Sequence, residues 1–162
     1  MLTGSAASAV AIEKKSGACI TFSESCDGSH YDAILERSRW TGTYMQGNTV
    51  FEYAINDVSN RVNEFMEEHE LRVDDIDYFV FHQAQKLILD NIADACGIPD
   101  EKVLVSLEEY GNTSGASVPL TLVLMRNCCI KRIVLMCLPV DLVLGCPAVL
   151  IIWNCQQMQF CL

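Results

Sequence analysis

The order strand, helix, strand in the middle of the chain constrains the fold more than any other feature. Residues 76–81 are rich in aromatic and β-branched side chains, which is typical of a buried strand. In residues 85–96 the apolar side chains recur on one helical face, and Gly97 follows where a C-cap is expected. Residues 102–107 predict the next strand. Because a helix separates the two strands, we expect them to be parallel neighbours in an α/β fold.

The flanking segments extend the same pattern. An apolar stripe at three- and four-residue spacing predicts a long helix over 51–69, and a further helix is expected from about Ser114 to Leu124. Residues 24–50 are polar and are interpreted as a loop region. Buried strands are predicted at residues 6–13 and 18–23, with a hairpin between them, and at residues 131–137 and 148–153.

The apolar segment 133–153 leaves two interpretations open, because its length would allow it to cross a bilayer. Asp141 near its middle, Pro139 and Pro147, and a high β-branched content favour two buried strands over a membrane helix. The N-terminus lacks a basic region followed by a leucine-rich run, so we expect no signal peptide. These features predict a cytoplasmic protein with no membrane partner.

Composition excludes several classes of function. The 162 residues suffice for about one domain with a substantial core, since 51% are hydrophobic. The net charge of −10 argues against nucleic-acid binding and against anionic membrane surfaces, because phosphate contacts need Lys and Arg. The 9 cysteines form no C-x-x-C motif and no zinc-like cluster with His. We therefore expect reduced, mostly buried thiols and no metal or other cofactor.

Two polar residues follow the predicted strands, at positions where α/β sheets bind ligands. His82 comes directly after the strand 76–81, and Asn112 lies five residues after the strand 102–107. Taken alone, each has a plainer interpretation, as a core histidine and as a turn residue. If the strands are parallel neighbours, however, both side chains reach the same sheet edge. A neutral imidazole and a carboxamide each supply an N–H donor, and two donors aimed at one oxygen form an oxyanion hole.

Three motifs around these residues carry a family resemblance. They are F-H-Q-A-Q at 81–85, I-P-D-E-K-V at 98–103 and Y-G-N-T-S-G-A-S-V-P-L at 110–120. They resemble the β-ketoacyl-acyl-carrier-protein synthase III family, which has H-Q-A-N and Y-G-N-T-S-x-x-S-x-P at these places. The resemblance is specific from about residue 75 to 122 and weaker towards both ends, and it concerns the C-terminal half of the family only.

The resemblance implies half of a thiolase-type fold. In the family, two duplicated α/β halves form a five-layer α-β-α-β-α sandwich, usually in a homodimer, and each half has a mixed sheet with a mainly parallel core. Residues 1–50 would then be the remnant end of the N-terminal half, made of strands and a loop. Residues 51–162 would be the C-terminal thiolase-like half-domain.

The resemblance also implies a function: decarboxylative condensation of an acyl thioester with malonyl-acyl carrier protein, in fatty-acid or related biosynthesis. A cysteine of the N-terminal half takes the acyl group, and a histidine and an asparagine then stabilise the enolate that forms as malonate loses CO2. These catalytic roles carry over to His82 and Asn112. The implied partners are acyl carrier protein, the acyl and malonyl thioesters, and either a complementary N-terminal half or a second copy in a homodimer.

Departures from the family motifs leave alternatives for the chain itself. No cysteine stands in the family's A-C-[SA]-G context, so the nucleophile segment is absent and we expect the chain to be inactive alone. Closely spaced glycines of the family's C-terminal loop are replaced by Cys137, Pro139 and Asp141, its opening aspartate by Ser5, and the last asparagine of H-Q-A-N by Gln85. The alternative to a condensing enzyme is a non-catalytic interaction or structural half-domain, or a degenerate fragment.

Overall fold

The computed structural model describes residues 3–10, 19–25, 28–36, 42–124, 132–137 and 148–154. The helices are α1 (Gly47–Glu68), α2 (Lys86–Cys96), α3 (Leu107–Tyr110) and α4 (Ser117–Leu124), with 3₁₀ turns η1 (Val73–Asp75), η2 (Asp100–Lys102) and η3 (Ser114–Ala116). The strands are β1 (Cys19–Ser25), β2 (Ile34–Glu36), β3 (Thr43–Met45), β4 (Tyr78–Phe81), β5 (Arg132–Cys137) and β6 (Ala148–Asn154).

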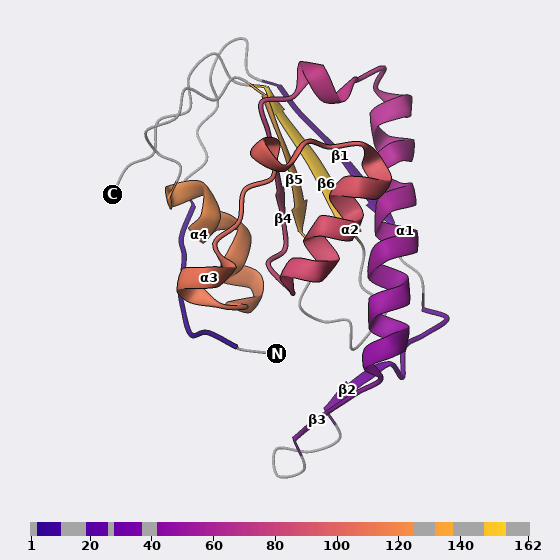
Figure 1. Ribbon diagram of the computed structural model, residues 1–162, viewed down its shortest axis with the longest axis vertical. Helices are drawn as coiled ribbons and strands as arrows, with labels where there is room; N and C mark the ends of the chain where they lie inside the picture. The colour runs from indigo at the N-terminus through magenta and orange to yellow at the C-terminus, as the bar shows by residue number, and fades with distance from the viewer. Residues whose placement is uncertain are drawn as a thin grey trace.

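The main sheet is mixed, as the α/β prediction with a mixed sheet requires, and its order is β1-β6-β5-β4. β4 and β5 run parallel, with Phe79 opposite Val134. The pairs β5–β6 and β6–β1 are antiparallel. β2 and β3 form a separate antiparallel hairpin, which projects beyond the N-terminal end of α1 (Figure 1).

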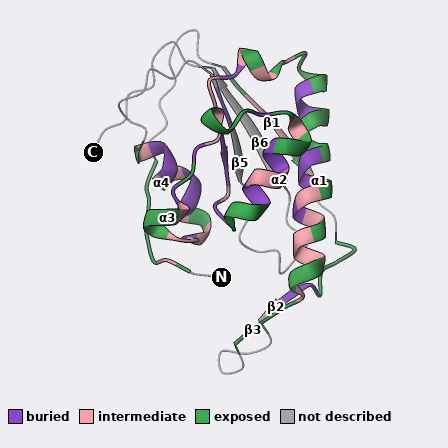
Figure 2. Ribbon diagram, viewed as in Figure 1, coloured by how far each residue is buried: buried purple, intermediate pink, exposed green. Residues whose placement is uncertain are grey.

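Helices cover both faces of the β4–β5 pair and give three layers (Figure 1). α1 and α2 pack against each other on one face, where Phe79, Phe81 and Val134 join the main core. Side chains alternate along a strand, so Val80 points to the other face, where α4 contacts β4 and β5. Figure 2 shows the buried positions concentrated on the inward sides of α1, α2 and α4. The arrangement is one α-β-α half of the predicted five-layer sandwich.

The end of α2 fixes the path of the chain towards the site. Gly97 adopts the left-handed conformation with φ +63°, and the Ile98 N–H donates to the Ala93 carbonyl at 2.9 Å. This bond satisfies a carbonyl of the last turn that would otherwise lack a helical partner. Lys102 then ties the next segment to the start of β4, because its Nζ donates to the Ile76 carbonyl at 2.7 Å.

The strand predicted at 102–107 is wrong. In the structure this segment pairs with β4 through a parallel bridge between Val103 and Phe79. Beyond this bridge the buried side chain of Gln83 takes the place of a second strand. Its Nε2 donates to the Leu104 carbonyl at 3.2 Å, and its Oε1 accepts from the Ser106 N–H at 2.8 Å. A side chain thus supplies the hydrogen bonds that a strand ladder would have made.

The described part of the first predicted strand is not a strand, and the predicted hairpin after it lies outside the described residues. Residues 6–10 form no strand, and residues 11–13 lie outside the described part of the chain. β1 confirms the second predicted strand, but it pairs with β6. The predicted loop over 24–50 contains β2 and β3, and α1 begins within it at Gly47. The four-stranded sheet therefore includes strands from both sides of the expected domain boundary after residue 50.

The apolar segment near the C-terminus contains the two predicted strands, β5 and β6, which pair with each other. This confirms the strand interpretation over the membrane helix for the residues that the structure describes there; residues 138–147 lie outside them. Among the described helices, none has the length and apolar character needed to cross a bilayer.

Candidate functional site

His82 lies at the carboxyl end of β4, directly after Phe81, and it is half-buried. Its Nδ1 lies 3.0 Å from the hydroxyl oxygen of Ser117, the first residue of α4. The backbone N–H of Gln83 donates to the same oxygen at 3.3 Å. One hydroxyl of α4 therefore holds both the histidine ring and the backbone where the chain leaves the sheet.

The surroundings of His82 favour a neutral ring. Burial lowers the pKa of His82 below its ordinary value of 6.5, and a hydrogen bond with the Ser114 backbone opposes part of this shift. Because the net direction is downward, the imidazole is uncharged at neutral pH. A neutral imidazole carries one N–H donor and one acceptor nitrogen, so it can donate a hydrogen bond to a developing oxyanion.

Asn112 lies in the turn between α3 and η3. Gly111 before it has φ +66° and ψ −165°, a conformation that is essentially restricted to glycine. The Ser114 N–H donates to Asn112 Oδ1 at 2.9 Å, so the turn occupies the acceptor atom and leaves the NH2 group for other partners. The Gly4 N–H donates to the Asn112 carbonyl at 2.9 Å, and the N-terminal segment thereby braces the turn.

Ser114 links the two predicted site residues. Its N–H holds the Asn112 side chain, and its backbone opposes part of the fall in the pKa of His82. Ser114 itself has φ +60°, which is uncommon for a residue with a side chain and occurs preferentially at functional sites. His82 and Asn112 thus adjoin the same stretch of backbone, and their catalytic roles stay predictions.

Polar side chains behind His82 form a closed set of hydrogen bonds, here called the buried polar ring: Gln83, Ser106, Ser117 and Thr121, which are between 0% and 5% exposed. Gln83 holds the Ser106 N–H, Ser106 Oγ lies 2.7 Å from Thr121 Oγ1, and Thr121 donates to the Ser117 carbonyl at 2.8 Å. The sequence analysis did not identify these residues. The available signal was weak: Gln83 and Ser117 stand within the motifs, but all four residues are of polar types for which exposure is the commoner state.

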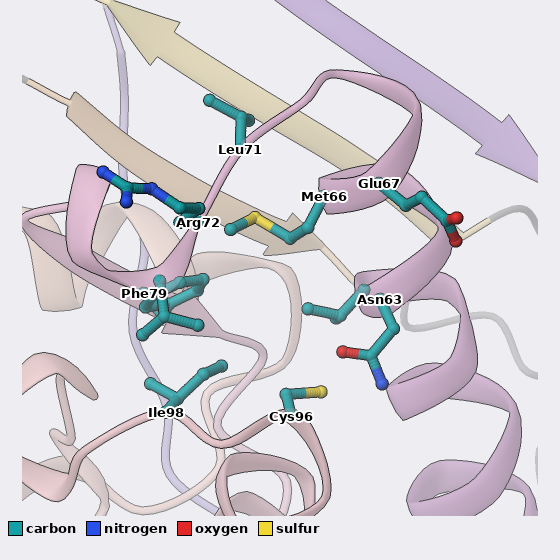
Figure 3. A pocket seen from close by; sticks show the side chains of 10 residues that line it. Asn63, Met66, Glu67, Leu71, Arg72, Phe79, Cys96 and Ile98 are labelled. Carbon is teal, nitrogen blue, oxygen red and sulfur yellow. The ribbon is translucent and has the colours of Figure 1, made fainter.

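A separate cavity of about 310 Å³ opens between the C-terminal part of α1, η1 and the end of α2 (Figure 3). Phe79 and Ile98 belong to its apolar lining, and neither His82 nor Asn112 lines it. Cys96 also lines this cavity. Burial raises the pKa of the Cys96 thiol to about 11, so it is protonated at neutral pH and a poor nucleophile.

The altered glycine positions of the C-terminal loop are described only in part. Cys137 is the last residue of β5, and Pro139 and Asp141 lie outside the described residues. Within the described ranges, no group of His, Cys, Asp and Glu side chains is arranged to hold a metal ion.

Comparison with known proteins finds relatives of one family. Residues 66–132 match the family described as 3-oxoacyl-[acyl-carrier-protein] synthase III C terminal. A β-ketoacyl-[acyl-carrier-protein] synthase III from Porphyromonas gingivalis is 45% identical over 85 residues, which are 52% of this chain and 25% of the relative. Its counterpart from Streptococcus pneumoniae is 38% identical over 104 residues, 64% of this chain and 32% of the relative. The matched region thus spans a third or less of these curated relatives.

Solved structures agree with the sequence matches. The 3-oxoacyl-(acyl carrier protein) synthase III of Pseudomonas aeruginosa has a TM-score of 0.73 and 26% identity, over 85% of this chain and 44% of that chain. The synthase III of Thermus thermophilus has a TM-score of 0.78 over 90% of this chain and 49% of that chain, and its 24% identity supports the fold alone. In sequence and in fold the chain is therefore similar to a C-terminal portion of thiolase-superfamily proteins of the 3-oxoacyl-[acyl-carrier-protein] synthase III type.

Proposed function

We propose that the chain supplies the C-terminal part of the active site of a 3-oxoacyl-[acyl-carrier-protein] synthase III. This enzyme would join an acyl thioester to malonyl-acyl carrier protein with loss of CO2. The observation that supports the proposal is the placement of His82 and Asn112, which come from separate segments and are held by the same stretch of chain. His82 Nδ1 lies 3.0 Å from Ser117 Oγ, and the Ser114 N–H donates to Asn112 Oδ1. The segment that holds all of these residues is also the one that matches the family.

In the proposed reaction, the bond between the malonyl C2 and its carboxylate breaks and CO2 leaves. The electron pair moves into the thioester, whose carbonyl oxygen becomes an enolate oxygen. His82 and Asn112 each donate a hydrogen bond to that oxygen, and each donor of this kind typically contributes about 100- to 1,000-fold in rate. The negative charge stays on the enolate oxygen and is stabilised by the two hydrogen bonds, so the step balances without a proton transfer.

The enolate carbon then attacks an acyl group that is held as a thioester on a cysteine. A carbon–carbon bond forms, the cysteine leaves as a thiolate, and the product is a 3-oxoacyl thioester. Cys96 does not fit this role, because its pKa is raised to about 11 and it lies in the separate cavity. We assign the nucleophile to a complementary N-terminal half of the family, which would assemble with this chain.

Reconstitution tests this function. The full chain is mixed with the N-terminal portion of the Porphyromonas gingivalis relative, and condensation of an acetyl thioester with malonyl-acyl carrier protein is followed. Activity should require both parts, and His82→Ala should lower it by at least about 100-fold. His69→Ala is the matched control, because His69 is exposed at the end of α1. An unchanged rate in His82→Ala would remove His82 from the mechanism.

The same experiment separates the alternative function. If sedimentation shows that the two parts assemble, but no condensation product forms, a non-catalytic interaction half-domain becomes the better description. If the parts do not assemble, the proposal for this chain is wrong.

A further inference from the structure

We propose that Ser117 is a positioning residue for His82. Its hydroxyl donates its proton to Nδ1 and so keeps the neutral ring in the tautomer that carries hydrogen on Nε2. The inference rests on the proposed function, in which the Nε2–H group is the donor to the substrate oxygen. It extends that function by proposing that the buried polar ring determines which nitrogen of His82 carries the hydrogen.

The direction of the hydrogen bonds in the ring follows from chemistry. A carbonyl oxygen only accepts, so the Thr121 hydroxyl donates its proton to the Ser117 carbonyl at 2.8 Å. Thr121 Oγ1 is then the acceptor in its 2.7 Å contact with Ser106, and the Ser106 hydroxyl is the donor. The hydroxyl protons of Ser106 and Thr121 are thus both used in hydrogen bonds within the buried polar ring.

The proton of the Ser117 hydroxyl needs a hydrogen-bond acceptor. The backbone N–H of Gln83 donates to Ser117 Oγ at 3.3 Å and occupies one lone pair. The side-chain acceptor found for the Ser117 proton among the described residues is His82 Nδ1, at 3.0 Å. Because a buried hydroxyl that leaves its proton unpaired loses stability, the proton is directed to Nδ1. A neutral ring that accepts at Nδ1 must carry its hydrogen on Nε2.

The buried polar ring also limits rotation of the Ser117 side chain away from His82. Ser117 is 1% exposed and begins α4, where Thr121 one turn later holds its carbonyl. Gln83 approaches from the other side and is itself held by the Phe81 carbonyl, to which its Nε2 donates at 2.8 Å. The hydroxyl is therefore fixed between a helix and the end of β4, and both elements also determine where the His82 ring lies.

The tautomer is measured on the full chain by nitrogen NMR with ¹⁵N-labelled histidine, at a pH where the ring is neutral. The chain has 3 histidines, so the spectrum of His82→Gln assigns the His82 signals by their loss. In the wild type, Nε2 should resonate as a protonated nitrogen and Nδ1 as an unprotonated one. Ser117→Ala should move both shifts towards a tautomer mixture, with a change in ratio of about fivefold for an ordinary hydrogen bond. Ser117→Thr keeps a hydroxyl and should retain the wild-type shifts.

Thr121→Val separates positioning from stability, because it removes a hydroxyl of the same ring that does not contact His82. It should lower the melting temperature and leave the tautomer unchanged. A wild-type ring protonated on Nδ1, donating to Ser117 Oγ or to the Ser114 backbone, would overturn the inference, and so would unchanged shifts in Ser117→Ala. If Ser117→Ala does not fold, the wild-type and Ser117→Thr spectra decide. The spectrum needs no turnover, so a failed reconstitution leaves its result standing.

Discussion

Replacing Gln83 by Leu should remove a large share of the stability of the protein. The side chain is 0% exposed, so its polar atoms have no access to water. Its Oε1 accepts from the Ser106 N–H at 2.8 Å, and its Nε2 donates to the Leu104 carbonyl at 3.2 Å. Leu has a similar volume, and the substitution therefore tests the unpaired backbone groups rather than a cavity.

The magnitude follows from the groups that would lose their partner. Three backbone groups would lose their partner in Gln83: the Ser106 N–H and the carbonyls of Leu104 and Phe81. A buried polar group left unpaired costs about 1–3 kcal/mol, so Gln83→Leu should lower the free energy of unfolding by roughly 3–9 kcal/mol. Small domains have about 5–15 kcal/mol in total. Urea denaturation followed by circular dichroism measures the change. Gln85→Leu is the matched control, since Gln85 is exposed and its replacement should cost less than about 0.5 kcal/mol. A loss below about 1 kcal/mol for Gln83→Leu would refute the reasoning.

Gly4→Ala should lower the melting temperature, because a Cβ on Gly4 would collide with the Tyr110 carbonyl oxygen. Gly28→Ala is the control and should leave the melting temperature unchanged, since nothing lies within 4 Å of a Cβ there. Thermal melts compare the two variants, and equal shifts would contradict the close approach at Gly4. Burial lowers the pKa of His82 below 6.5, so the unfolded state binds the proton more readily and stability should fall as the pH drops below about 6.5. His82→Gln should lose less stability over the same interval, as urea midpoints at about pH 7.5 and 5.5 would show; parallel losses would assign the acid sensitivity to other groups.

Elements with a strong local signal were predictable from the sequence. The apolar stripe of α1 and the glycine at the end of α2 act within a few residues, and the structure follows them. The segment 102–107 shows why other elements were not. Its apolar pattern is equally compatible with pairing to a strand or with pairing to the Gln83 amide from an earlier part of the chain. The choice depends on tertiary contacts, which override local β-propensity.

The sequence analysis named two candidate positions, His82 and Asn112, whose roles stay predictions, and it did not identify the network behind them. His82 and Asn112 were chosen from the motifs and from the end of β4, whereas the second predicted strand, before Asn112, is not formed. The buried polar ring was missed because Ser106, Ser117 and Thr121 are of residue types that are mostly exposed. The pairing of β1 with β6 was missed for the same kind of reason: strand partners far apart in the chain leave no local pattern.

The central claim is that His82 and Asn112 donate to the same oxygen. Values of kcat/KM for the reconstituted protein, for His82→Ala, for Asn112→Ser and for the double variant test it most directly; Ser at 112 keeps a short acceptor for the turn but lacks the amide donor. Each single variant should lose at least about 100-fold, and the double variant should lose much less than the product of the single losses, because the two donors act as a unit. A single variant at the wild-type rate, or losses that multiply, would contradict the claim.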